Sequence, residues 1–130
     1  KADICKLPFE NDMYDLILCN HVLEHIPEDQ KAMSELYRIL KKGGTLIAQV
    51  PIDENRLKTF ENWRITSPNE RAKVFGQYDH VRIYGKDYYS RLEKVGFKAK
   101  AFDLISKLKP AELIYFGLKN EKIPIAVKNY

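Results

Sequence analysis

Apolar and polar positions along the chain follow an α/β rhythm. The runs at 14–20 and 45–51 are apolar without alternation, which is typical of parallel strands buried on both faces. Between them, residues 28–42 predict a helix, because acids occupy its first turn, lysines its last, and apolar residues recur every three or four positions. Gly43 and Gly44 then predict the end of this helix. Together these elements make a right-handed parallel βαβ unit, so the predicted fold class is α/β.

Residues 53–84 differ from the rest of the chain, because they mix polar and aromatic residues with weak periodicity. A segment this long between regular elements favours a functional lid or an acceptor-binding insertion. The regular pattern then returns and predicts a helix at 86–95, a half-exposed strand at 97–105, a short helix or insertion at 109–119 and a last strand at 123–129.

Composition excludes several classes of protein. The net charge of +4 comes from lysines scattered over 130 residues, so a nucleic-acid partner is not expected. No apolar run approaches the length of about 20 residues that spans a bilayer, and a signal peptide is not evident. Cys5 and Cys19 lack a zinc or CxxC spacing and indicate reduced thiols in a cytoplasmic protein.

Several motifs occur in a specific order: "AD" followed by "LPF", then "YDLI", "HVLEHI", "ELYRILKKGG" and "TLIAQVP". Together they resemble the class I S-adenosylmethionine-dependent methyltransferases, of the small-molecule kind related to ubiquinone-biosynthesis enzymes. "RIYGKDYYSRLEKVGFKAK" is similar to that family's penultimate helix and strand. The resemblance implies a Rossmann-like fold, S-adenosylmethionine as cofactor and transfer of a methyl group to a small-molecule acceptor.

One departure from the family pattern concerns its first strand and glycine-rich turn, which would lie upstream of Asp3. Residues 1–130 therefore resemble a single incomplete domain, its C-terminal part, and we expect this chain alone to be inactive. The family sheet order 3-2-1-4-5-7-6 implies a half-sheet of strands 4-5-7-6 here, with "LILC" at its edge. An apolar edge invites pairing with the missing N-terminal half or with a second copy in a homodimer. The alternative function is thus a non-catalytic half-domain that binds a partner chain through this edge.

The resemblance also assigns cofactor-binding residues. It implies that Asp3 accepts a hydrogen bond from the adenine amino group and that the amide of Ile4 faces the ring, with Leu7 and Phe9 as apolar cover for the adenine. Asn20 and His21 follow a strand, at the carboxyl end where ligands of parallel sheets bind, and would face the methionine part. In the alternative interpretations, Asp3 is a solvated residue and Asn20 forms a turn through a local hydrogen bond.

The motif "HVLEH" raises the question of a metal. His21 and His25 are four residues apart with Glu24 beside them, but the glutamate that directly follows the first histidine in HExxH is missing. No third ligand lies nearby in the sequence, so we expect no metal. We expect His21 to face the cofactor or acceptor, where it is a candidate general base, and His25 to pack against the sheet.

The segment "YDHVRIY" supplies the other candidate residues. Asp79 and His80 could remove a proton from the acceptor, and Arg82 could hold an anionic acceptor. Alternatively, Arg82 and Asp79 join the segment by a salt bridge and His80 caps the next element. Three aromatic residues are expected at the acceptor pocket: Trp63, Tyr78 and Tyr84. In the alternative interpretation, Trp63 belongs to the core of a helical lid.

Overall fold

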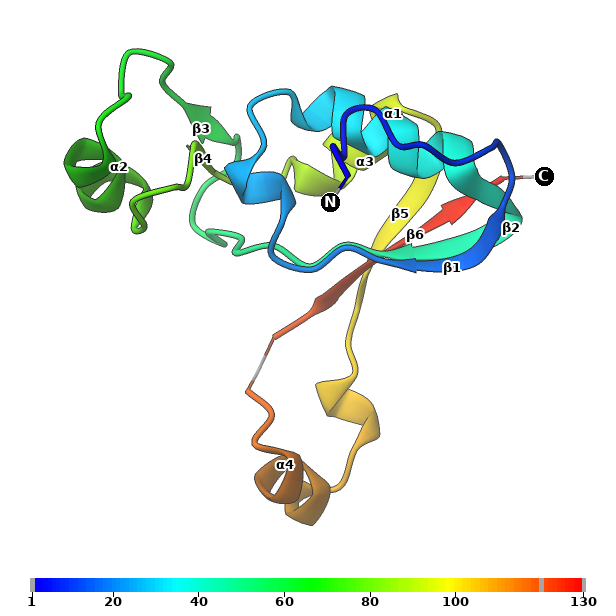
Figure 1. Cartoon of the computed structure of the whole chain (residues 1–130). Helices are drawn as coiled ribbons and strands as arrows, with labels where there is room; N and C mark the ends of the chain where they lie inside the picture. The colour runs from blue at the N-terminus through cyan, green and yellow to red at the C-terminus, as the bar shows by residue number, and fades with distance from the viewer. Residues whose placement is uncertain (1, 120, 130) are drawn as a thin grey trace.

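A computed structural model describes residues 2–119 and 121–129. Its main feature is a four-stranded sheet in the order β1-β2-β6-β5 (Figure 1). The strands are β1 (Tyr14–Leu18), β2 (Leu40–Ile47), β5 (Phe97–Phe102) and β6 (Ile123–Lys128). β1 and β2 are parallel, whereas β6 is antiparallel to both β2 and β5. This order is that of the predicted 4-5-7-6 half-sheet, so the α/β class and the strand order are confirmed.

Two helices cover one face of the sheet, α1 (Asp29–Ile39) and α3 (Tyr88–Lys94) (Figure 1). The apolar stripe predicted for the first helix is buried as expected, because its spacing places it on the side that faces the strands. The core of this layer consists of large side chains that are almost fully inaccessible: Leu23, Met33, Leu36, Leu46, Tyr84, Tyr88, Leu92 and Phe97.

The boundary between α1 and β2 corrects the sequence prediction. The helix ends at Ile39 instead of residue 42, and the extended Leu40 already pairs with Tyr14 of β1. Gly43 and Gly44 therefore lie within β2, where the register with β1 shifts and Gly43 has a φ of 76°. The glycines allow this irregularity in the strand, because a left-handed φ is strained for other residues.

The burial of β1 is a second correction. Leu16 and Leu18 are 55% and 63% exposed, although the sequence predicted a strand buried on both faces. The reason is that α1 and α3 cover only one face of the sheet. Ile17 pairs with Leu46 on that covered face, while the side chains on either side of Ile17 point the opposite way.

Two substructures extend from the sheet layer (Figure 1). Residues 53–84 hold a two-stranded antiparallel sheet of β3 (Phe60–Glu61) and β4 (Arg82–Ile83), with α2 (Pro68–Phe75) between the strands. The other is an arm between β5 and β6. It carries the 3-10 helix η2 (Ile105–Lys107) and α4 (Pro110–Phe116), which confirms the short helix predicted there.

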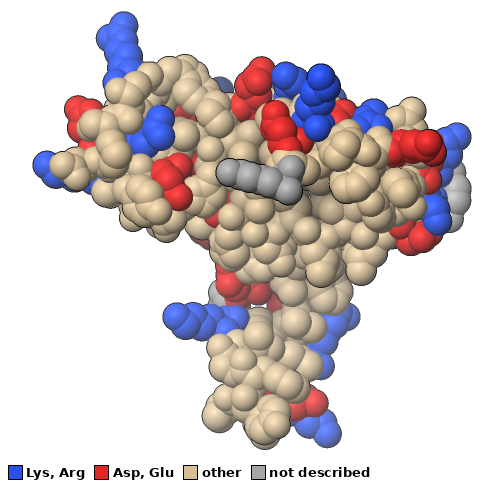
Figure 2. All heavy atoms as spheres, in the orientation of Figure 1, with Lys and Arg blue, Asp and Glu red and all other residues tan. Residues whose placement is uncertain are grey.

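The surface carries no stripe of one charge on the face that Figure 2 shows. Lysine and arginine side chains alternate with acidic ones around the sheet layer, and the arm is largely uncharged on this side. Within the described residues, no helix combines the length and apolarity needed to cross a membrane.

Candidate cofactor and acceptor site

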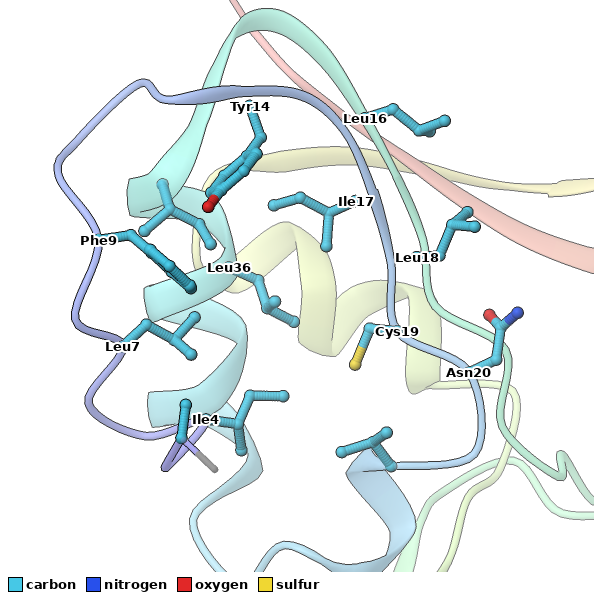
Figure 3. Close-up of a pocket in the computed structure, with 13 residues that line it drawn as sticks. Ile4, Leu7, Phe9, Tyr14, Leu16, Ile17, Leu18, Cys19, Asn20 and Leu36 are labelled. Carbon is cyan, nitrogen blue, oxygen red and sulfur yellow. The ribbon is translucent and has the colours of Figure 1, made fainter.

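An apolar cavity of about 500 Å³ lies between β1, α1 and the segment that precedes β1. Ile17 and Cys19 point toward α1, and the side chains of the N-terminal segment close the opposite wall (Figure 3). That wall includes residues that the family resemblance places near adenine: Ile4, Leu7 and Phe9. The cavity therefore brings the expected apolar cover of a planar ring together with the end of the first strand.

Two side chains of α1 hold this wall in place. The carboxylate of Glu35 accepts a hydrogen bond from the Leu7 amide at 2.8 Å. Arg38 donates to the carbonyl oxygens of Leu7 at 3.1 Å and Phe9 at 2.7 Å. The hydrogen bond from Arg38 lowers the pKa of the Glu35 carboxyl group to about 2. Sequence reasoning missed both residues, whose only signal is their three-residue spacing on the helix.

Asp3 lies at the edge of a neighbouring hollow of about 480 Å³ that Ile4 also lines. One carboxylate oxygen of Asp3 accepts a hydrogen bond from the amide of Cys5 at 2.9 Å, so the residue forms a local turn. Its side chain is exposed, as the alternative interpretation expected.

Asn20 and His21 lie just beyond the carboxyl end of β1. The side-chain oxygen of Asn20 accepts from the amide of Gln49 at 3.2 Å, and the His21 amide donates to the Gln49 carbonyl at 2.8 Å. Asn20 thus links two chain segments instead of forming a local turn, and it points away from α1 (Figure 3). His21 has a φ of 54°, which is uncommon for a histidine and turns the chain sharply.

The next residues form a polar cluster with the loop that precedes β4. Glu24, in the 3-10 helix η1 (Leu23–His25), is 2% exposed, and its Oε1 lies 3.5 Å from His21 Nδ1. The rings of His25 and His80 meet edge to face, with centroids 4.7 Å apart. Asp79 contacts His25, with Oδ2 3.3 Å from Nδ1. The structure therefore gathers His21 and His80, predicted as catalytic, around a buried carboxylate.

The electrostatics of this cluster affect its neighbours. Burial, together with the negative charge of Glu24, raises the pKa of the Cys19 thiol to about 11. A hydrogen bond from Gln77 lowers the pKa of Asp79, and the adjacent His25 acts in the same direction. Asp79 is accordingly a carboxylate that contacts His25, and the neighbouring His80 also lowers its pKa.

Arg82 occupies a different place from the one expected. It is 1% exposed, and its guanidinium donates to the carbonyl oxygens of Leu23, Ile26 and Pro27. Its Nε donates to Glu61, so the alternative interpretation, a salt bridge with Asp79, is also wrong. These contacts give Arg82 a structural role instead of a role in acceptor binding.

The three aromatic candidates fall into two groups. Tyr84 is fully buried, and its hydroxyl donates to Asp29 at 2.9 Å, while burial raises its pKa well above the usual range. Tyr84 therefore supports the core and does not face an acceptor. Trp63 and Tyr78 are 57% and 62% exposed, so solvent reaches both side chains.

Residues 1–48 match the family described as methyltransferase domain. An uncharacterized protein of Methanocaldococcus jannaschii is 44% identical over 90 residues, which are 68% of this chain and 40% of that protein. The ubiquinone/menaquinone biosynthesis C-methyltransferase UbiE of Brucella canis is 25% identical over 78% of this chain and 43% of the enzyme. These matches support a class I S-adenosylmethionine-dependent methyltransferase, as the sequence motifs had suggested.

The fold agrees with this family. A solved S-adenosylmethionine-dependent methyltransferase from Thermotoga maritima superposes with a TM-score of 0.57 at 17% identity, over 98% of this chain and 62% of that one. The chain spans less than half the length of the two curated relatives above, at 40% and 43%. The agreement in fold accounts for the order of the strands in the sheet.

Proposed function

We propose that this methyltransferase domain binds S-adenosylmethionine with its adenine in the cavity beside β1 and transfers the methyl group to a small-molecule acceptor. The observation that carries the proposal is the apolar wall of Ile4, Leu7 and Phe9, which the family match covers. A flat adenine ring gains most from such a wall, with few polar contacts needed to orient it. Asp3 lines the neighbouring hollow, which shares Ile4 with this cavity, and from there its carboxylate could accept from the adenine amino group.

The acceptor would lie beyond the carboxyl end of β1, next to the polar cluster. His21 is 60% exposed in its side chain, so its imidazole could reach a bound molecule and accept a proton from it. Tyr78 and Trp63 are accessible on the substructure formed by residues 53–84, which we propose as the lid over the acceptor. Methyl transfer needs mainly alignment of the two reactants, so such a lid would contribute by positioning.

The test is a ligand-observed saturation-transfer NMR measurement with S-adenosylhomocysteine and this chain. We expect stronger saturation of the adenine protons than of the methionine part, because the apolar wall contacts the ring. Ile4→Asp should abolish the effect, whereas Ile114→Asp, at a position on α4 that is 82% exposed, should preserve it. Equal saturation with both variants, or none with the unchanged protein, would contradict the proposed adenine site.

A second candidate function is supported by the exposed side of β1. Leu16 and Leu18 lie on the edge strand of the described sheet and remain largely accessible. A non-catalytic module that pairs with a second copy or another chain would use this edge. It would show no saturation transfer to S-adenosylhomocysteine and would instead associate through β1.

A further inference from the structure

All three histidines of the chain lie in one place. His21 and His25 flank Glu24 after β1, and His80 reaches them from the loop before β4, 55 positions after His25. One ligand atom from each of Glu24, His25 and His80 lies within 4.8 Å of the other two. The sequence spacing alone offered no third ligand near the HVLEH motif. In the fold, His80 lies beside Glu24 and His25 and can serve as that ligand.

The carboxylate of Glu24 is the decisive feature of this cluster. The residue is 2% exposed, and its Oε2 has no hydrogen-bond partner among the described residues. Its other oxygen lies 3.5 Å from His21 Nδ1 and 3.9 Å from His25 Nε2. A buried carboxylate is costly unless a cation or several donors compensate it, and nearly all buried polar atoms in proteins have a partner. An imidazole nitrogen can present a lone pair as well as a proton, so these rings can act as metal ligands.

We propose that Glu24, His25 and His80 bind a divalent transition-metal ion, with zinc as the ion that fits best. Two imidazoles and one carboxylate are a donor set typical of zinc, whereas magnesium and calcium prefer oxygen ligands throughout. Three protein ligands leave a fourth position of a tetrahedral ion open to solvent or to another molecule. The ion would supply the positive charge that the buried carboxylate requires.

The surroundings of His25 fit this assignment. Its Nε2 faces Glu24, and its Nδ1 lies 3.3 Å from Asp79 Oδ2. Histidines that bind a metal through one nitrogen commonly direct the other toward a carboxylate, which orients the ring. His25 Nδ1 has no hydrogen-bond partner among the described residues, so a small ring rotation would satisfy both nitrogens at once.

The ligand atoms need to approach one another only modestly. Tetrahedral ligands around zinc lie about 3.4 Å apart, given zinc–nitrogen bonds of about 2.0–2.1 Å. The observed span of up to 4.8 Å therefore closes through rotation of side chains. His25 and His80 are only partly buried and can rotate, while Glu24 is fixed by packing. His21, which is more exposed, remains free to face a bound acceptor.

The proposal is independent of methyl transfer, because the ion can be titrated in the absence of any cofactor. The experiment adds zinc to the metal-stripped chain and follows the imidazole nitrogens by long-range proton–nitrogen NMR, in which single substitutions assign each of the 3 histidines. We expect one equivalent to bind and the signals of both His25 and His80 to shift. Cobalt bound at the same site in place of zinc should show the absorption bands of a tetrahedral ion.

Glu24→Gln keeps the shape of the side chain and removes its charge, so we expect zinc affinity to fall at least about 100-fold, since even outer-shell changes cost 10–100-fold. Glu28→Gln is the matched control, because this surface acid pairs with Lys31. His80→Ala, at a partly exposed position, provides the decisive comparison if the Glu24 variant does not fold by circular dichroism.

The proposal is wrong if the unchanged chain binds no stoichiometric zinc, or if His80→Ala binds it as tightly. It is equally wrong if either His25 or His80 keeps its signal unchanged at saturating zinc. Failure of S-adenosylhomocysteine to bind would contradict the proposed cofactor site. It would not affect the zinc proposal, which is tested by the zinc titration alone.

Discussion

Arg82 donates from Nε to Glu61 Oε1 at 2.7 Å, directly across the paired strands β3 and β4. The same Glu61 oxygen accepts from Arg91 of α3 at 3.0 Å, and Arg91 also binds Asp29 of α1. This network of alternating charges runs from residues 53–84 into the helical layer. The proposed lid is therefore anchored to the core at its base, and Arg82 is the buried centre of that anchor.

Replacing Arg82 tests this structural role. We expect Arg82→Leu to lower the free energy of unfolding by about 3–5 kcal/mol. The substitution removes one of the two donors to Glu61 and leaves the carbonyl oxygens of Ile26 and Pro27 without the guanidinium that binds them. Denaturant unfolding measures the change. Arg64→Leu, at an exposed position nearby, should change stability by no more than about 0.5 kcal/mol. An Arg82 variant that unfolds at the same denaturant concentration as the original would contradict the anchor.

Arg82 also shows why sequence reasoning could not identify the site completely. Proximity in sequence suggested Asp79 as its partner, whereas the actual partners are Glu61, 21 positions away, and the carbonyls that follow η1. Which residues meet over such separations depends on how residues 53–84 pack against the helical layer. The periodicity of the sequence carries no information about that packing. For the same reason the sequence could not place His80 beside Glu24.

Periodicity did predict the elements whose stability is local or whose face is set by spacing. The stripe of α1 is an example, since amphipathic spacing determines it. The order of the four strands was instead implied by the family resemblance. The prediction was wrong for Leu16 and Leu18, because a continuous apolar run does not reveal whether a second layer is present. The predicted helix end at Gly43 was wrong, because a pair of glycines can occur at an irregularity within a strand as well as at the end of a helix.

Glu35 should make the wall of the cavity sensitive to acid. Its pKa is lowered from 4.5 to about 2 in the folded protein, chiefly by Arg38, so its ionised form stabilises the fold. This contribution is fully present above pH 4.5 and is lost as the pH falls toward 2. Glu35→Gln should lower stability at pH 7 by about 1 kcal/mol, since hydrogen bonds to a charged group are lost, and should weaken the pH dependence in this window.

Unfolding at a series of pH values checks the prediction for Glu35, with Glu93→Gln on the exposed side of α3 as the control. The control should have the same free energy of unfolding as the unchanged protein at every pH. If Glu35→Gln followed it as well, the contacts of Glu35 with Arg38 and the Leu7 amide would contribute nothing to stability.

The two thiols should differ in reactivity. Cys19 is 5% exposed with a pKa of about 11, so at pH 8 only about 0.1% of it is thiolate, the reactive form. Cys5 is partly exposed and should react first with a disulfide reagent, at least about 10-fold faster, because access also limits Cys19. The time course of Cys5→Ser should contain only the slow phase. Two equal rates in the original protein would contradict the burial of Cys19.

The edge strand β1 gives the last prediction, which separates the two candidate functions. Leu18 is 63% exposed, so Leu18→Lys should change the free energy of unfolding by no more than about 0.5 kcal/mol. If the edge binds a second copy, the buried lysine charge should abolish that association, as charged residues do at natural sheet edges.

Sedimentation velocity over a range of concentrations measures the association, and Leu57→Lys, at a position outside the sheet that is 75% exposed, controls for added charge. Self-association that is lost with Leu18→Lys but kept with Leu57→Lys would assign the contact to β1. A monomer at all concentrations, or two variants that associate equally, would contradict pairing of two copies through this edge.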